Sequence, residues 1–275
     1  MLIIRPMVYK IHPYRWPTIG IDISHIEKTR IEDIKHFFYS HYAPNNAILT
    51  ITGNANPETA YKLSEKWFGS IKKRNVKKRS LPAEPEQHIP QYESVYKDVP
   101  ADALYKMWHI GPRLSEDFHV LDLITDILAG GESGRLYTKL VKQKKLFSDI
   151  NAYMTSDIDP GLVILNGKLM KGVDIATAEK EVNNIFTGLK EKYVPKNELE
   201  KVKNKFEATT LFSNTSILNK AMNLGFFELL GDPGMINKET ETFKRTDKNK
   251  VLEISNKYFT DSNCTTLYYK STRKS

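Results

Sequence analysis

A helix–turn–strand pattern occurs twice in this chain of 275 residues, and the second copy lies 217 positions after the first (246 − 29 = 217). Four positions of similar chemistry coincide under this shift. They are Thr29 with Thr246, Ile34 with Val251, Phe37 with Ile254, and Asn46 with Asn263. A repeat of this kind predicts one complete domain preceded by the tail of a related one, in which the counterpart of residues 92–217 is absent.

The length fits one large domain or two ordinary ones. A basic run over residues 72–79 is followed by a proline-containing stretch without hydrophobic periodicity, residues 81–86, which predicts a solvated linker. The formal net charge of +8 also raises a nucleic-acid site, but this run lacks the interleaved aromatic residues that stack on bases. We therefore expect a first segment over 1–75, a linker over 76–91, a second domain over 92–275, and no nucleic-acid partner.

The first segment is expected to contain two helices and one strand. Thr29 and Glu32 have the spacing of a capping box before the first helix, and Asn56 followed by Pro57 is a typical start for the second. The strand is expected over 47–52, where the residues are largely β-branched. The expected buried stripes are Ile31, Ile34, Phe38 and Tyr42 in the first helix, and Ala60, Leu63, Trp67 and Ile71 in the second.

After the linker the periodicity changes repeatedly between that of strands and that of helices, which predicts an α+β domain. The expected strands are 92–99, 103–110, 149–155, 162–170 and 264–269. The expected helices begin near residues 115, 135, 174, 199, 217 and 246. Apolar stripes such as Leu121, Ile124 and Leu128 should face the core.

Tests for catalytic and metal motifs are negative. Cys264 is the single cysteine, so an intrachain disulfide and a multi-cysteine zinc site are both excluded, and its place on a strand favours a buried thiol. None of the seven histidines begins an H-x-x-E-H or H-E-x-x-H motif. His119 and Asp122 share a helix face, which favours a surface hydrogen bond over a two-ligand metal site. We expect no catalytic residue and no metal ligand in this chain.

No apolar run approaches the roughly 18 residues that span a bilayer. The first ten residues have one Arg, an early Pro6 and no small-residue cleavage site, so no secretory signal is expected. A soluble protein is predicted, and its compartment stays undetermined.

Five segments of the chain are distinctive when taken in order. They are HPYRWPTIG at 12–20, FYSHYAPNNA at 38–47, Gly53-Asn54, Trp67-Phe68-Gly69, and GGESGRLY at 130–137. In this order they resemble the pitrilysin/insulinase superfamily of zinc metallopeptidases, in the branch of the processing peptidases. The resemblance covers essentially the whole chain. A turn or a helix stop explains each segment alone, but not their order.

The resemblance implies homologous α+β domains, each a mainly antiparallel sheet packed with helices, that pair into a clam-like chamber. It also implies that the zinc ligands, an H-x-x-E-H helix and a more distant glutamate, lie upstream of the HPYR segment. This chain would then be the C-terminal, noncatalytic portion of a zinc peptidase, with zinc in the full-length protein and no activity by itself. Its partners would be a peptide substrate and the missing zinc-bearing N-terminal region.

Noncatalytic subunits of the family carry an Arg and a Tyr, seven residues apart, that contact substrate. Val141 and Ser148 occupy these positions here in an ungapped alignment. The resemblance then implies that the intact protein is a zinc-bearing half, with that pair supplied by a homologous partner subunit. The alternative is a noncatalytic scaffold or partner subunit, which is favoured if the natural reading frame starts at Met1.

The candidates for contact with substrate lie in the two most family-like segments. They are His12, Arg15, Gly131, Glu132, Ser133 and Arg135. The alternative for Arg135 is that it holds the glycine-rich turn through backbone carbonyls, and for His12 and Arg15 it is loop packing. The stripes of the first segment need a sheet to cover them, so we expect this segment to pack on the second domain or to pair with another chain.

Overall fold

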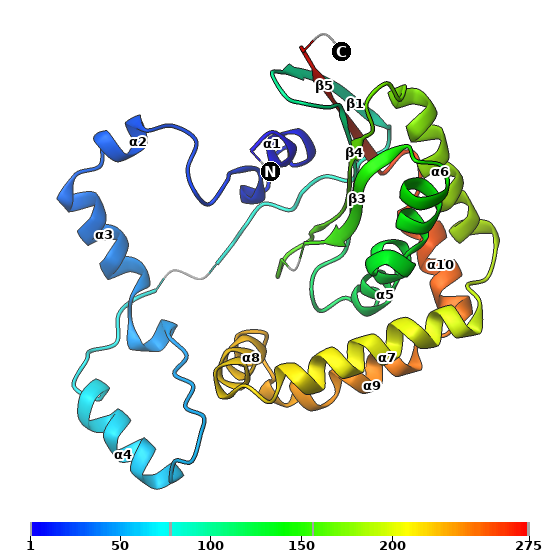
Figure 1. The fold of residues 1–275 in the computed structure, drawn as a ribbon. Helices are drawn as coiled ribbons and strands as arrows, with labels where there is room; N and C mark the ends of the chain where they lie inside the picture. The colour runs from blue at the N-terminus through cyan, green and yellow to red at the C-terminus, as the bar shows by residue number, and fades with distance from the viewer. Residues whose placement is uncertain (1, 77–78, 156, 274–275) are drawn as a thin grey trace. The chain divides into compact units, whose positions relative to one another are not determined.

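The computed structural model describes residues 2–76, 79–155 and 157–273 (Figure 1). Lys77 and Lys78 of the basic run lie outside these ranges. By its internal contacts the chain divides into two compact units. The first comprises Met1–Ala83 and Ala208–Glu239, and the second comprises Glu84–Glu207 and Thr240–Ser275. Residues 208–239, which the sequence analysis placed in the second domain, are therefore grouped with the first unit.

The second unit is built on a five-stranded sheet with the order β1-β5-β2-β4-β3. Its strands are β1 (Gln91–Lys97), β2 (Ala103–His109), β3 (Phe147–Met154), β4 (Leu162–Leu169) and β5 (Cys264–Ser271). β1 and β5 are parallel, whereas the pairs β5–β2, β2–β4 and β4–β3 are antiparallel. The expectation of an α+β fold with a mainly antiparallel sheet is confirmed.

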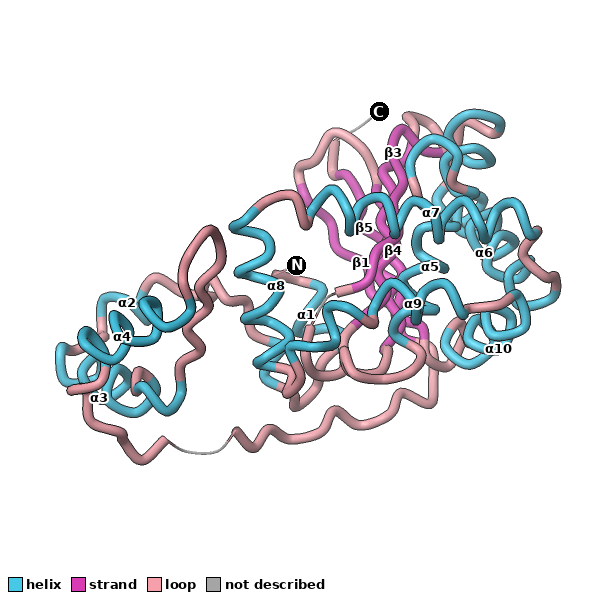
Figure 2. The backbone as a smooth tube through the Cα atoms, turned by 90° about the horizontal axis from the view of Figure 1, so that it is seen from below, coloured by secondary structure: helices cyan, strands magenta, loops and turns pink. Residues whose placement is uncertain are grey.

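Helices cover one face of this sheet, as both backbone views show (Figures 1 and 2). They are α5 (Phe118–Ala129), α6 (Ile175–Glu191) and α10 (Lys248–Tyr258). Leu104 and Trp108, four residues apart on β2, join Ile124 of α5 and Val182 of α6 in one buried cluster. The pleat points every second side chain to the same face, so residues four apart share that face.

The expected helix starts are close to those observed. Asp174 caps α6 by accepting a hydrogen bond from the Thr177 N–H, at the expected start of this helix. α10 is capped by Asp247 rather than Thr246, since the Asp247 carboxylate accepts from the Lys250 N–H. The expected helix at 135–143 is present, but its last part, Tyr137–Gln143, is a π-helix. The unit is completed by α7 (Lys196–Ser213), which continues into the first unit, and α9 (Glu239–Arg245).

The first unit contains helices and no strand among its described residues. The helices are α1 (Ile4–Val8), α2 (Ser24–Glu27), α3 (Ile31–His41), α4 (Pro57–Phe68) and α8 (Ile217–Leu229). The capping box predicted for Thr29 and Glu32 is wrong by one residue. Asp33 instead accepts from the Arg30 N–H, and the Thr29 hydroxyl donates to the His25 carbonyl. Asn56 caps α4 as expected.

The strand predicted over 47–52 is absent, and the stripes predicted to be buried on α3 and α4 are exposed except at Ala60, which is half-buried. Ile34 is 53% exposed and Trp67 is 66% exposed. The physical reason is the same in both cases. A strand needs neighbours for its backbone hydrogen bonds, and an apolar helix face needs a surface to cover it. The described part of the first unit supplies neither.

The sequence repeat has a structural counterpart in these two units. α3 and α10 are both 11 residues long, and their first residues differ by 217 positions (248 − 31). At the end of α3 the Asn46 Nδ2 donates to the His41 carbonyl at 2.8 Å, and at the end of α10 the Asn263 Nδ2 donates to the Tyr258 carbonyl at 2.9 Å. The same residue, at the same position, makes the same hydrogen bond in each copy.

The basic run and the linker each contain a described residue that is hydrogen-bonded to the rest of the chain. The Arg74 guanidinium donates to the Tyr42 carbonyl at 2.9 Å, so one member of the basic run is fixed beside α3. At the other end the Gln87 amide donates to the carbonyls of Ser262 and Cys264. No helix in the described ranges has the length and apolarity required to cross a membrane.

The two copies of the repeat allow a matched test of stability. Ile254 of α10 is fully buried and its counterpart, Phe37 of α3, is 56% exposed. Ile254→Ala should therefore reduce the free energy of unfolding by about 2–5 kcal/mol. Phe37→Ala should change it by less than about 0.5 kcal/mol. Urea unfolding of both variants measures this, and equal losses would show that the exposed copy is covered in solution.

Candidate functional site

The glycine-rich segment forms a tight turn directly after α5. Gly131–Ser133 is a single 3₁₀ turn, and Gly131 has φ = +76°, in the region that favours glycine. Gly134 is required for space, because a Cβ there would lie 2.8 Å from the Leu128 carbonyl oxygen. The sequence pattern thus produces a turn that lies close against the end of α5.

Two basic side chains connect this turn to α7. The Arg135 guanidinium donates two hydrogen bonds to the Glu198 carboxylate, at 2.9 Å and 2.6 Å. The Lys201 ammonium donates to the Ser133 hydroxyl at 3.1 Å. The structural alternative for Arg135 assumed backbone carbonyls, and the observed partner is a carboxylate. A bidentate pair of this kind fixes orientation as well as distance.

The tip of the turn faces solvent. Gly131, Glu132 and Ser133 are exposed, while Arg135 is half-buried by its pairing with Glu198. The turn therefore offers a carboxylate and a hydroxyl on a rigid support. The π-helix follows at once, and such helices are frequent at functional sites.

Val141 and Ser148, which the resemblance aligns with an Arg and a Tyr, lie in different environments. Val141 packs against the buried cluster of the second unit. The Ser148 hydroxyl donates to the Lys168 carbonyl at 3.2 Å, next to a bulge in β3. Valine has no side-chain hydrogen-bond donor and the serine hydroxyl is short, so neither side chain reaches as far as an Arg or a Tyr would.

His12 and Arg15 belong to the first unit, whereas the glycine-rich turn belongs to the second. His12 is buried, its Nδ1 accepts from the Tyr14 N–H at 3.2 Å, and its ring packs on that of Tyr14 at 4.4 Å. Arg15 donates to the Lys10 carbonyl at 2.7 Å. These contacts are those of a packed loop. The structure thus brings together Gly131, Glu132, Ser133 and Arg135, and it describes His12 and Arg15 as a separate group.

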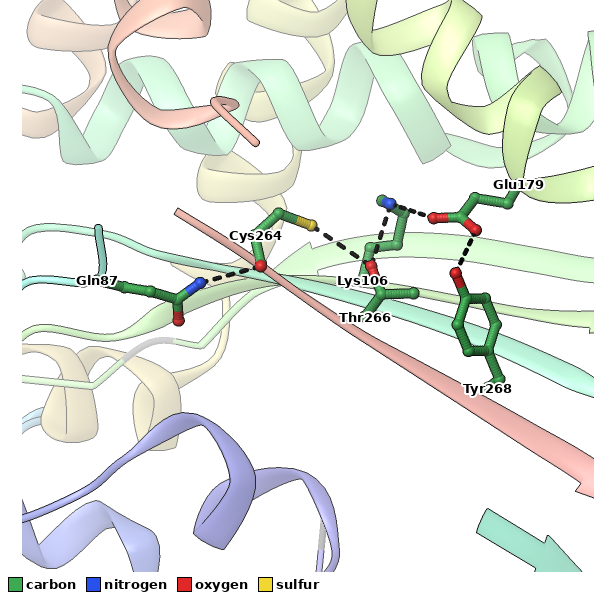
Figure 3. Close-up of polar contacts among 6 residues, drawn as sticks. All are labelled: Gln87, Lys106, Glu179, Cys264, Thr266 and Tyr268. Atoms are coloured by element: carbon green, nitrogen blue, oxygen red, sulfur yellow. Dashed lines mark hydrogen bonds and ion pairs between the residues drawn. The ribbon is translucent and has the colours of Figure 1, made fainter. Parts of the chain in front are cut away.

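A buried polar cluster between the sheet and α6 was missed by the sequence analysis (Figure 3). The Lys106 ammonium donates to the Glu179 carboxylate at 2.7 Å and to the Thr266 hydroxyl at 3.2 Å. The Tyr268 hydroxyl donates to the other Glu179 oxygen at 2.6 Å, and burial with this bond raises the Tyr268 pKa. Period-two counting from Leu104 to Trp108 would have placed Lys106 on the core face.

This cluster has the properties of a structural contact rather than of a reactive site. Burial raises the pKa of the Cys264 thiol, so its reactive thiolate form is disfavoured. Lys106 and Glu179 satisfy each other's charge in the interior, which is the usual condition for burying them. The expectation that Cys264 is a small buried thiol is confirmed by its 6% exposure.

The described residues do not fit a zinc ion. They contain no group of three or more His, Cys, Asp and Glu side chains placed to share a metal. His119, which shares a helix with Asp122, has a pKa lowered to about 4 by burial and, secondarily, by the charge of Arg113. Its ring packs against Phe243 at 4.7 Å. We therefore derive no catalytic step through zinc from this chain.

Comparison with known proteins also finds peptidases, as the resemblance of the sequence motifs does. Residues 29–206, more than half of the chain, match the family described as "Peptidase M16 inactive domain". The chain is 26% identical over 267 residues to the zinc protease PqqE of Helicobacter pylori, covering 95% of this chain and 60% of that protein.

Solved structures agree on the fold. A protease from Helicobacter pylori superposes with a TM-score of 0.87 at 24% identity, over 97% of this chain and 65% of that one. A peptidase M16 inactive domain from Pseudomonas fluorescens superposes with a TM-score of 0.85 at 17% identity, over 99% and 64%. This chain thus spans less than two thirds of the length of each of these three proteins.

Replacement of Arg135 tests whether its pairing supports the turn. Arg135→Lys keeps the charge but cannot form the bidentate pair, so we expect a loss of about 1–2 kcal/mol in the free energy of unfolding. Lys205→Met is the matched control, because it removes a more exposed ion pair with Asp126 and should cost less than about 1 kcal/mol. Equal effects in chemical denaturation would contradict the anchoring role.

The environment of His119 predicts a pH-dependent stability. Its folded pKa of about 4 lies below the ordinary value of 6.5, so the unfolded chain binds more protons between these values. This contribution to stability is complete above about pH 6.5 and is lost as the pH falls toward 4. NMR titration of the His119 ring checks the pKa. His119→Leu should flatten the pH dependence of the melting temperature, whereas replacing the exposed His36 by Leu should not.

Proposed function

The chain belongs to the peptidase M16 inactive-domain family, and on that premise we propose that it forms the noncatalytic, C-terminal portion of a zinc-dependent peptidase. Two observations support this proposal. The sequence match covers 95% of this chain but only 60% of a relative described as a zinc protease. The described residues also lack a group of side chains that could hold a metal. The zinc and the residues that act with it are assigned to the part of the protein outside this chain.

Within that enzyme, this portion contributes one wall of a peptide-binding chamber. The observation that carries this role is the exposed turn at Gly131–Ser133, which Arg135 and Lys201 hold against α7. A peptide backbone presents N–H groups that can donate hydrogen bonds to the Glu132 carboxylate and the Ser133 hydroxyl. A rigid support matters because a positioning group must not move when the peptide binds.

The remaining sequence candidates take a supporting part in this proposal. His12 and Arg15 are engaged in loop packing by their hydrogen bonds, so we assign them a structural role and assign peptide contact to the glycine-rich turn. The absence of a long donor at Val141 and Ser148 agrees with a partner subunit that supplies one.

A noncatalytic scaffold is the second candidate function. It is favoured by the apolar faces of α3 and α4, which suit a lasting contact with another polypeptide. The two functions differ in one measurable property, since a scaffold needs no zinc and turns over no peptide in any form of the protein.

The proposal predicts different activities for the two lengths of the protein. The full-length product of the natural gene should bind one zinc ion and hydrolyse an unstructured fluorogenic peptide, whereas the 275-residue chain should do neither. Metal analysis and a peptide-cleavage assay measure both. Glu132→Ala in the full-length enzyme should raise KM several-fold with a smaller effect on kcat, and Glu27→Ala, an exposed residue of α2, is the control.

Stoichiometric zinc with turnover by the 275-residue chain would contradict the proposal. A full-length protein without zinc and without activity would favour the scaffold instead.

A further inference from the structure

β1 forms an open edge of the sheet in the second unit. The strand order β1-β5-β2-β4-β3 gives it one neighbour, β5, within the described ranges. Every residue of Gln91–Lys97 pairs with a residue of β5 in one continuous register, without a bulge. A regular edge strand of this kind presents unpaired backbone N–H and C=O groups that a further strand can bind.

One hydrogen bond shows which backbone groups of β1 point away from β5. The Thr272 N–H donates to the Lys97 carbonyl at 2.9 Å, so Lys97 directs its backbone groups toward β5. In an extended strand the N–H and C=O of one residue point to the same side, and those of the next residue point to the other side. Tyr92, Ser94 and Tyr96 therefore direct their N–H and C=O groups outward.

The opposite edge strand, β3, is built differently. Its register shifts between Phe147 and Asp149, and the Asn151 side chain accepts a hydrogen bond from the Ala152 N–H at 2.9 Å. A bulge and a side chain that competes for a backbone group both hinder the pairing of an edge strand with another chain. The regular edge of β1 lacks the bulge, so it is the edge of this sheet that is better suited to further pairing.

The side chains along β1 are exposed on both faces of the strand. Tyr92 and Tyr96 are each 61% exposed on one face. Glu93 and Lys97 are exposed on the other face, four residues apart. The edge thus carries aromatic rings on one face and two opposite charges on the other.

These charges are complementary when two copies of β1 run antiparallel. A pairing centred on Val95 sets Glu93 opposite the partner's Lys97, and Lys97 opposite the partner's Glu93. Opposite charges directly across an antiparallel pair stabilise it, whereas like charges destabilise it. A shift of the register by two residues in either direction loses both charge pairs.

The same register uses the outward backbone groups. Ser94 lies opposite the partner's Tyr96, and Tyr96 lies opposite the partner's Ser94. Each of these two pairs can exchange two N–H···O bonds, because both of its residues direct their backbone groups outward. The exposed rings of Tyr92 and Tyr96 lie on one face of this pairing, where diagonal cross-strand contacts are within reach of aromatic side chains.

We propose that β1 is a self-association surface, on which two copies of this chain join edge to edge in an antiparallel pair centred on Val95. The two second units then share one continuous sheet across a twofold axis. The partner is a second copy because the strand itself supplies both members of each charge pair. This inference does not depend on the proposed peptidase function, since the surface uses no residue of the glycine-rich turn.

Sedimentation velocity of the 275-residue chain tests the association. The chain should change from monomer toward dimer as its concentration rises. Ser94→Pro should raise the dissociation constant at least about tenfold, because it removes an outward N–H and obstructs the edge. β5 does not use that N–H, so the variant should keep its fold, which an unchanged melting temperature verifies.

Charge reversal tests the register. Glu93→Lys sets like charges opposite each other and should raise the dissociation constant about tenfold. The double variant Glu93→Lys with Lys97→Glu restores both charge pairs and should return the affinity to within about threefold of the original. Glu191→Lys, at the exposed end of α6, is the matched control and should have no effect. A chain that is monomeric at every concentration would overturn the proposal, and so would an association that none of the β1 variants weakens.

Residue-resolved hydrogen exchange distinguishes this edge from other surfaces. In dilute solution the amides of Ser94 and Tyr96 should exchange faster than those of Glu93 and Val95, which bond to β5. At high concentration Ser94 and Tyr96 should gain at least about tenfold protection. The same dependence is expected in the full-length protein. Protection of Ser94 there that does not change on dilution would show that the polypeptide covers its own edge, and would overturn the proposal.

Discussion

The requirement that every strand satisfy its backbone hydrogen bonds governs this chain more than any single residue does. In the second unit the requirement is met late, because β5, almost the last segment of the chain, fills the position between β1 and β2. The sheet therefore closes only when residues near the end of the chain pair with residues near 91–109. Where this pairing exists, the helices find a surface to cover, and the buried cluster forms.

The first unit shows the same local sequence signals without that closure. α3 begins and ends at positions equivalent to those of its counterpart α10. The local sequence signals therefore suffice to form the helix. Local signals do not decide whether the helix is buried. An amphipathic stripe indicates that a covering surface is needed, but it does not indicate which part of the protein supplies that surface. This difference explains why one copy of the repeat is part of a core and the other presents its apolar face.

Much of the fold could be predicted from the sequence, because most helices and strands here are bounded by capping or turn residues that are close in sequence. Asn56 caps α4 as expected, and α6 and α10 begin within about two residues of the expected positions 174 and 246. The predictions failed where the outcome depends on distant residues. The strand at 47–52 lacks partners, and residues 208–239 group with a unit that begins more than a hundred residues earlier.

The candidate site divides in the same way. The glycine-rich turn was identified by its pattern, but the partner of Arg135 is Glu198 on α7, which no local spacing indicates. Lys106 was missed because a lysine between apolar residues of a strand suggests solvent, whereas here Glu179 and Thr266 hold it in the interior. Charged residues that pair across long sequence separations are visible only in three dimensions.

A structure of the full-length protein with its metal bound is the most direct test of this account. The account predicts zinc ligands that all lie outside residues 2–273. A zinc ion held by side chains of this chain would contradict it.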